Sequence, residues 1–252
     1  MKRSWWKGLG STAIDLVYPP HCPGCAELAE QDRSIGSSGL ELCQTCQTEL
    51  WPCEDPRCQV CGESFLPAGP SRFVCGTCRG QNFAFEFAVS PYQSKGVLRD
   101  MIHRFKYQSQ LSLRPVLGQF LAEVLEDNRI RSLEPGWITV PVPLHPRRYR
   151  EREFNQSLEL CLELKRHGGI PIVSALRRTR YTPSQTHYRR DQRRVNLKGA
   201  FALKRWRASR VRGRTVALVD DVFTTGSTAN ECAAILRSAG AKKVVVITLA
   251  RG

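Results

Sequence analysis

The stretch Val216-Ala217-Leu218-Val219-Asp220-Asp221-Val222-Phe223-Thr224-Thr225-Gly226-Ser227-Thr228 decides the fold of this 252-residue chain. It predicts a buried strand over 215–219, an acidic pair at the carboxyl end of that strand, and a hydroxyl-rich loop that opens a helix over 228–238. Loop amides and a helix N-terminus form a cradle for a phosphate, to which hydroxyl groups add hydrogen-bond donors. The acidic pair suits the hydroxyls of a ribose, or Mg²⁺ held mainly by the phosphates of a ligand.

Further strands and helices alternate along the chain around this stretch. Strands are predicted over 83–89, 137–142, 200–203 and 243–249, and helices over 95–107, 113–125 and 154–164. Strands separated by helices indicate an α/β fold with a parallel sheet covered on both faces. Ligands of such sheets bind beyond the carboxyl ends of the strands. The chain has no Gly-Lys dipeptide, which excludes a Walker A loop.

Nine of the 11 cysteines precede residue 80, and eight of them form four Cys-x-x-Cys pairs: Cys22 with Cys25, Cys43 with Cys46, Cys58 with Cys61, and Cys75 with Cys78. The gap of 17 residues between the first two pairs and that of 13 residues between the last two fit zinc ribbons. A disulfide framework needs an oxidising compartment, to which nothing in the N-terminus directs the chain. Four thiolates leave no open coordination position, so the expected zinc is structural, in one or two sites. Cys53 remains unassigned.

These features divide the chain into two predicted domains. Residues 1–80 are expected to form an N-terminal helix and a double zinc ribbon, in which zinc supplies folding free energy that the few apolar residues do not. Residues 81–252 are expected to form the α/β domain. No apolar run is long enough to span a membrane, and no secretory signal peptide is evident, so we expect a soluble, cytoplasmic protein.

The net charge of +15 is concentrated in one part of the sequence. Residues 137–214 contain 20 basic and five acidic residues, whereas the rest of the chain has equal numbers of each. Such an excess indicates contact with a polyanion, the alternative being a solvated basic face. The arginines of this segment are interleaved with aromatic residues, a mixture that suits single-stranded DNA: Tyr149, Phe154, Tyr181, Tyr188 and Trp206. Phe154 and Trp206 also fit a role in the core.

The thirteen-residue stretch resembles the phosphoribosyl pyrophosphate (PRPP) loop of type I phosphoribosyltransferases. This resemblance implies a phosphoribosyltransferase-like fold that binds PRPP with Mg²⁺. Asp220 and Asp221 would bind the ribose hydroxyls, and the following loop would hold the 5′-phosphate through Thr224, Thr225, Gly226, Ser227 and Thr228.

Other stretches resemble the ComF family of competence-associated proteins. They are Phe105-Lys106-Tyr107, Pro141-Val142-Pro143-Leu144-His145-Pro146-Arg147-Arg148, Arg152-Glu153-Phe154-Asn155-Gln156, Thr182-Pro183-Ser184-Gln185 and Arg193-Arg194-Val195-Asn196-Leu197-Lys198-Gly199-Ala200-Phe201. The paired cysteine motifs before a phosphoribosyltransferase domain match as well. One departure is Glu153, where that family usually has glycine.

A pyrophosphate site is expected next to the phosphate loop. The segment 141–145 leaves a strand at the ligand edge, and Arg147, Arg148 and Arg152 follow it with guanidinium groups suited to a pyrophosphate. By the resemblance to phosphoribosyltransferases, residues 182–196 would correspond to the mobile loop that closes over the substrate, with Gln185, Arg189 and Arg193 as further candidates. His145 is either a general acid or a structural hydrogen-bonding residue. No catalytic residue is assigned.

Two functions fit the sequence. One is a PRPP-binding accessory protein that binds single-stranded DNA, alongside other DNA-uptake proteins, in natural transformation or DNA use, as the ComF resemblance implies. The other is an active phosphoribosyltransferase that transfers phosphoribosyl from PRPP to a nucleobase-like acceptor and releases pyrophosphate. Such a reaction needs orientation and charge neutralisation rather than covalent catalysis. No base-reading residues stand out.

Overall fold

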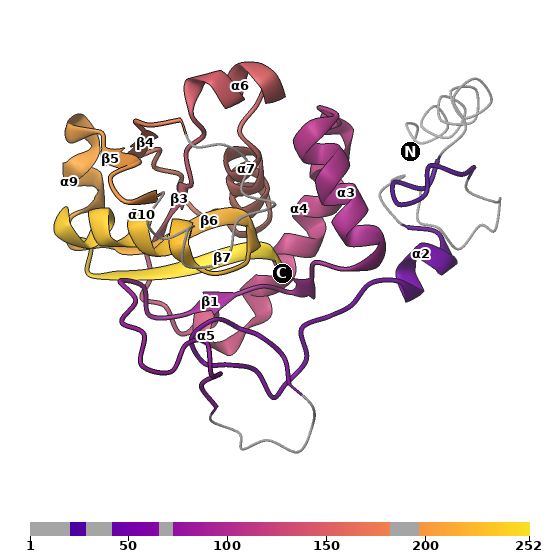
Figure 1. Cartoon of the computed structure of the whole chain (residues 1–252), viewed down its shortest axis with the longest axis horizontal. Coiled ribbons are helices and arrows are strands. Elements are labelled where there is room, and N and C mark those ends of the chain that lie inside the picture. Colours follow the sequence, from indigo (N-terminus) through magenta and orange to yellow (C-terminus); the bar gives the residue numbers. More distant parts are fainter. Residues whose placement is uncertain (1–20, 29–41, 66–72, 182–196) are drawn as a thin grey trace, which may run out of the picture.

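The computed structural model describes residues 21–28, 42–65, 73–181 and 197–252. A parallel sheet lies at the centre, with the strand order β1 (Ala88–Val89), β7 (Lys243–Arg251), β6 (Thr215–Phe223) and β3 (Ile138–Pro141). A further short strand, β2 (Tyr92–Gln93), pairs with the end of β7. Figure 1 shows β6 and β7 as the long central strands of this sheet. The expected α/β fold class, with four-cysteine ribbons before a parallel sheet, is confirmed.

The two long strands bury both of their faces, and alternate residues enter separate cores. Ala217, Val219 and Ile247 belong to one core, while Val216 and Leu218 belong to the other. All five are fully buried. This alternation explains why the strands read as continuous apolar runs in the sequence, because a parallel sheet with helices on both faces has no solvated side.

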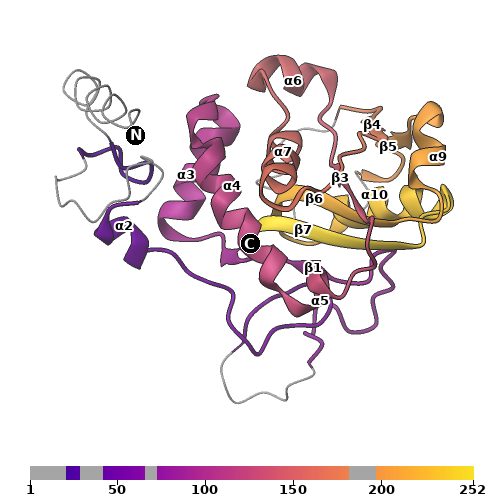
Figure 2. The same ribbon diagram turned by 180° about the vertical axis from the view of Figure 1, so that it is seen from behind.

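Helices α3 (Gly96–Tyr107), α4 (Arg114–Ala122) and α7 (Gln156–Gly168) cover the first core, and α10 (Ser227–Ser238) covers the second. Figures 1 and 2 show α4 between α3 and α7. The remaining elements are α2 (Gln44–Thr48), η1 (Leu111–Leu113), η2 (Glu123–Glu126), α5 (Asn128–Arg131), α6 (Pro146–Arg152), β4 (Leu176–Arg178), β5 (Phe201–Leu203), η3 (Arg205–Arg207) and α9 (Ala208–Val211). Strands β4 and β5 form a separate antiparallel pair.

The two groups of cysteine pairs join different cores. Cys22 and Cys46 pack in the core beneath α3, whose Arg104 donates hydrogen bonds to the carbonyls of Pro23 and Gly24. The cysteines of the second group pack in the core beneath α10. The ribbons therefore contact the α/β part directly. The predicted domain boundary at residue 80 stays a prediction, and the predicted N-terminal helix lies outside the described residues.

Several boundaries differ from the sequence prediction. Strand β6 continues through Asp220 to Phe223, because backbone pairing with β7 extends past the acidic pair, where Asp220 lies opposite Thr248. The strand predicted over 83–89 shortens to Ala88–Val89, since the Ala84 amide donates to the side chain of Asn230 instead of a neighbouring strand. Helix α6 was not predicted. Within the described residues, no helix has the length and apolar character needed to cross a membrane.

Candidate ligand pocket and zinc centres

A pocket of about 430 Å³ opens where β6 ends and α10 begins. Its lining combines the loop after β6 with the C-terminal half of α3 and with basic side chains of α6 and β4. The residues that bear on its chemistry are His103, Lys106, Tyr107, Arg148, Arg152, Arg178, Asp220, Thr224, Thr225, Gly226, Ser227 and Thr228. The position agrees with the rule that ligands of parallel sheets bind beyond the carboxyl ends of the strands.

The acidic pair is held by contacts from two helices. Oδ1 of Asp220 accepts hydrogen bonds from the Ser157 hydroxyl of α7 and from the Asp221 amide, both at 3.0 Å. Asp221 forms an ion pair with Lys106 of α3, whose Nζ lies 2.9 Å from Oδ1. Burial and the charge of Asp221 raise the pKa of Asp220 to about 7, against the opposing effect of Lys106. Asp220 therefore titrates near neutral pH.

The loop after β6 has a conformation that requires glycine. Gly226 has a φ of +74°, and a Cβ atom there would lie 2.7 Å from Cζ of Phe223. Helix α10 begins at the next residue, so its N-terminal amides face the pocket region. The hydroxyl oxygens of Thr225 and Ser227 lie 2.9 Å apart. Amides, hydroxyls and a helix N-terminus thus lie together in this loop, and its binding of an anion stays a prediction.

The candidate pyrophosphate residues divide into three groups. Arg148 and Arg152 line the pocket. The buried guanidinium group of Arg152 lies 4.8 Å from the ring centroid of Tyr107 and donates a hydrogen bond of 3.1 Å to Oε1 of Gln156. Arg147 is not among the lining residues; its Nε pairs with Glu151 at 3.2 Å. Gln185, Arg189 and Arg193 lie outside the described residues, as does Tyr188.

His145 has a structural role at the start of α6. Its Nδ1 accepts a hydrogen bond from the Arg147 amide at 3.2 Å, which caps the helix. It is not among the residues that line the pocket. Of the two roles considered from the sequence, the geometry agrees with the structural one.

Three cationic residues of the pocket were not assigned from the sequence: Arg99, Lys106 and Arg178. Lys106 belongs to the Phe105-Lys106-Tyr107 motif, and the resemblance of this motif to the ComF family could have indicated that Lys106 is functional. Arg178, on the short strand β4, had no such signal, because its position depends on the pairing of β4 with β5. Burial and the nearby charge of Arg148 lower the pKa of Arg178. Its proximity to Arg148 concentrates positive charge at this side of the pocket.

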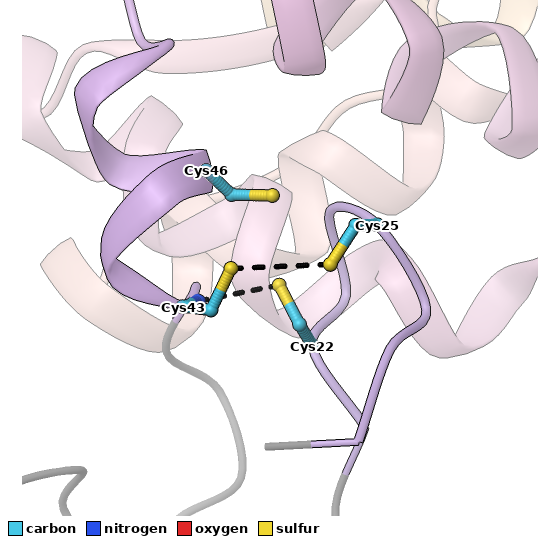
Figure 3. Close-up of side chains that lie close together, drawn as sticks. All are labelled: Cys22, Cys25, Cys43 and Cys46. Carbon is cyan, nitrogen blue, oxygen red and sulfur yellow. Dashed lines mark hydrogen bonds between the residues drawn. The ribbon is translucent and has the colours of Figure 1, made fainter. Parts of the chain in front are cut away.

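The four cysteine pairs assemble into two compact groups. Cys22, Cys25, Cys43 and Cys46 form one and Cys58, Cys61, Cys75 and Cys78 the other, with the sulfur atoms of each group within 4.8 Å of one another. Figure 3 shows the sulfur atoms of the first group directed toward a common centre from two segments of the chain. This arrangement fits one tetrahedral ion in each group, which supports structural zinc at both groups.

Backbone amides support the thiolates that zinc requires. The sulfur of Cys22 accepts hydrogen bonds from the amides of Gly24 and Cys43 at 3.3 and 3.2 Å, and that of Cys58 accepts one from Cys75 at 3.4 Å. Although burial opposes ionisation, these amide contacts lower the pKa of both Cys22 and Cys58 to about 7. Cys53 belongs to neither group, and burial raises its pKa to about 11.

Comparison with known proteins agrees with this description. Residues 13–79 match the double zinc ribbon domain family. Over 231 residues the chain is 34% identical to the DNA utilization protein YhgH of Escherichia coli K12, covering 91% of this chain and 97% of that protein. It is 32% identical over 233 residues to competence protein F of Haemophilus influenzae, covering 92% and 95% of the two chains. The chain belongs to the ComF family.

Among solved structures, a glutamine PRPP amidotransferase from B. subtilis aligns with 54% of this ComF-family chain and 26% of its own, with a TM-score of 0.35 and 24% identity.

The departure from the ComF pattern at Glu153 has a visible consequence. Glu153 follows α6 with a φ of +66°, in the left-handed region that glycine adopts without strain. Glu153 thus adopts a backbone conformation in which glycine would be unstrained.

Proposed function

We propose that this ComF-family chain binds PRPP with Mg²⁺ in the pocket and single-stranded DNA on the adjoining basic surface, and that it acts in DNA uptake or use in the cytoplasm. The main observation in favour of this ligand is that one pocket is lined by Asp220, a hydroxyl-rich loop and several cations. Asp221 is not a lining residue and contacts the pocket residue Lys106. PRPP presents matching chemistry, with a ribose diol between a phosphate monoester and a pyrophosphate.

Each part of the pocket has a role in this proposal. Asp220 and Asp221 bind the ribose hydroxyls, and residues 224–228 hold the 5′-phosphate. Arg148 and Arg152 neutralise the pyrophosphate. Mg²⁺, when bound, shields the phosphate charges and is held mainly by the ligand, beside the acidic pair. Lys106 now pairs with Asp221 at 2.9 Å, so ligand binding has to rearrange this ion pair.

The DNA half of the proposal is supported by exposed aromatic side chains between basic residues. Trp206 is 72% exposed between Arg205 and Arg207, and Tyr149 is 50% exposed on α6 between two further arginines. Phe154, in contrast, is buried and packs against Phe105 in the core. Exposed rings beside cations suit the stacking of bases and the neutralisation of phosphates.

The relatives support the biological setting. Their names refer to DNA utilization and to competence, which fits a protein that handles incoming DNA together with other DNA-uptake proteins.

Calorimetry tests the PRPP site. We expect the wild-type chain to bind Mg²⁺–PRPP, and a double variant with Asp220→Asn and Asp221→Asn to lose binding while keeping its far-UV circular dichroism spectrum. Equal affinity of the two proteins would refute the site assignment.

Fluorescence anisotropy with labelled single-stranded DNA tests the basic surface. Binding should weaken steeply with salt, because cations on phosphates release counterions. Trp206→Ala should lose about 1–3 kcal/mol of binding free energy, the usual contribution of one stacked base. Trp51→Ala is a matched control, because Trp51 is 52% exposed beside Lys95 on another part of the molecule. Equal losses in both variants, or no binding at low salt, would overturn this half of the proposal.

A phosphoribosyl transfer reaction is the second candidate, favoured by an aromatic pair on the pocket wall. His103 and Tyr107 of α3 lie with ring centroids 4.8 Å apart, and Tyr107 is 49% exposed. This pair suits the stacking of an acceptor base beside PRPP. Pyrophosphate release in the presence of nucleobases or single-stranded DNA tests the reaction, and Tyr107→Ala should reduce it. Absence of release with every acceptor would leave PRPP as a ligand only.

A further inference from the structure

A buried arginine connects the second four-cysteine group with the phosphate loop. Arg251, at the end of β7, is 7% exposed. Its Nη1 donates hydrogen bonds to the carbonyls of Phe223 and Thr224, both at 3.1 Å. Its Nη2 donates to Oε2 of Glu63 at 3.1 Å and lies 3.7 Å from Sγ of Cys61. One guanidinium group therefore contacts a predicted zinc ligand and the first residues of the loop at once.

The two carbonyl contacts lie where the chain leaves β6 and turns toward Gly226. The guanidinium group also lies 5.4 Å from the ring centroid of Phe223, the ring against which Gly226 packs. Phe85 contacts the same ring edge-on, with centroids 5.9 Å apart. Because a planar guanidinium donates in fixed directions, Arg251 restricts the carbonyl orientations and thereby the path of the loop.

The ribbon side of this connection is also tightly held. Gly62, next to Cys61, has a φ of +70°, and a Cβ atom there would lie 3.0 Å from the Ala88 carbonyl. The Ala88 amide donates to the Val60 carbonyl at 2.7 Å, which joins the knuckle to β1. An ion bound by the four sulfurs would fix Cys61 and, two residues later, Glu63. These are the two ribbon residues that Nη2 of Arg251 contacts.

We propose that Arg251 is a positioning residue through which zinc in the second four-cysteine group orders the phosphate-binding loop and raises its affinity for a phosphate ester. This inference rests on the proposed function, in which residues 224–228 hold the 5′-phosphate of PRPP. The first four-cysteine group is attached in another way, since Arg104 binds it to α3 through the carbonyls of Pro23 and Gly24. The two zinc sites thus have different effects on the pocket.

Hydrogen exchange of the full-length, zinc-loaded protein measures loop order without any ligand. Cys78→Ser weakens the second group without removing a group that contacts Arg251, and Cys25→Ser is the matched change in the first. We expect exchange over residues 223–228 to become about tenfold faster in Cys78→Ser and to stay unchanged in Cys25→Ser, while the centre of β7 stays protected in both. Zinc content should fall by one ion in each. Equal loop exchange in the two variants would refute the proposal.

Changes at the connection itself give a second test that does not depend on metal loss. Arg251→Met removes the carbonyl contacts, and Glu63→Gln, at a half-exposed position, weakens only the ribbon-side contact. Both should keep zinc at two ions per chain and accelerate loop exchange, by about tenfold for Arg251→Met and less for Glu63→Gln. Arg104→Met is the control and should leave loop exchange unchanged. Unaltered exchange in Arg251→Met would overturn the proposal.

Calorimetry with Mg²⁺–PRPP separates this inference from the proposed function. If both hold, the affinity for PRPP falls about tenfold in Arg251→Met but not in Arg104→Met. If the wild-type chain binds no PRPP while the exchange results are as expected, the proposed function fails and the structural connection stands. If PRPP binds equally to wild type and Arg251→Met, the connection does not control affinity.

Discussion

Replacing Asp220 by asparagine should stabilise the ligand-free protein while it destroys the proposed ligand site. Burial and the charge of Asp221 raise the pKa of Asp220 from 3.8 to about 7, a change of roughly three pH units. At about 1.4 kcal/mol for each unit, holding this carboxylate ionised costs up to about 4 kcal/mol of folding free energy. Asparagine carries no charge and avoids this cost.

The substitution preserves the contacts of the side chain. The hydrogen bonds from the Ser157 hydroxyl and the Asp221 amide both end on Oδ1, and an amide oxygen can accept both of them. Lys106 keeps its ion pair with Asp221 at 2.9 Å. The free energy of unfolding at pH 8 should therefore increase, with about 4 kcal/mol as the upper limit because Asp220 lines a pocket that is open to solvent.

The pH dependence gives the sign of the effect. Because folding raises the pKa of Asp220, the native state binds the proton more tightly than the unfolded state, and wild-type stability falls as the pH rises from about 4 to about 7. Asp220→Asn lacks this titration. Its advantage is absent below about pH 4, roughly half developed at pH 5.5 and complete above about pH 7.

Urea denaturation of the full-length, zinc-loaded proteins at pH 5.5 and pH 8 measures the difference. Lys106→Met is the control of opposite sign, because it leaves Asp221 without its cation and should lose about 3–5 kcal/mol at pH 8. An Asp220→Asn variant that is no more stable than wild type at pH 8, or that gains the same amount at both pH values, would refute the reasoning.

Three further predictions concern the backbone and the metal. Glu153→Gly should stabilise the protein by up to about 1 kcal/mol in thermal denaturation, because the residue has a φ of +66°; lower stability would mean that Glu153 makes compensating contacts. Gly226→Ala should lose about 1–3 kcal/mol and abolish PRPP binding, since its methyl group meets the Phe223 ring; unchanged calorimetry would contradict the loop assignment. Elemental analysis should find two zinc ions per chain; one ion per chain would disprove the two-site arrangement. A strong chelator should unfold residues 21–28, 42–65 and 73–80 in a protease assay. It should also lower the melting temperature of the remainder, with which the ribbons share their cores.

Local sequence was enough for the features that arise from short-range chemistry. The spacing of the cysteine pairs indicated zinc, because two thiolates in a tight turn form half of a tetrahedral site whatever surrounds them. The apolar runs of β6 and β7 indicated buried parallel strands, and the stretch from Asp220 to Thr228 indicated an anion cradle. Helix α3 was placed to within one residue by its amphipathic pattern.

Local sequence did not indicate which residues of distant segments come together in the pocket. Arg147 and Arg148 are neighbours in the sequence with the same chemistry, yet only Arg148 lines the pocket, because the turns of α6 direct them differently. Trp206 is a large apolar residue that would suit a core, yet it is 72% exposed, whereas Phe154 is buried. Such differences depend on which surface of each element meets a neighbour.

The sequence by itself determined the fold class and the two four-cysteine groups, and it predicts the phosphate loop, since each is encoded in residues that are close together along the chain. Only the tertiary structure brought Lys106 to the acidic pair, added Arg178 to the pocket, and joined Cys61 to Thr224 through Arg251. These contacts link residues far apart in the sequence. Their existence depends on the packing of helices and ribbons around the sheet, which no local pattern specifies.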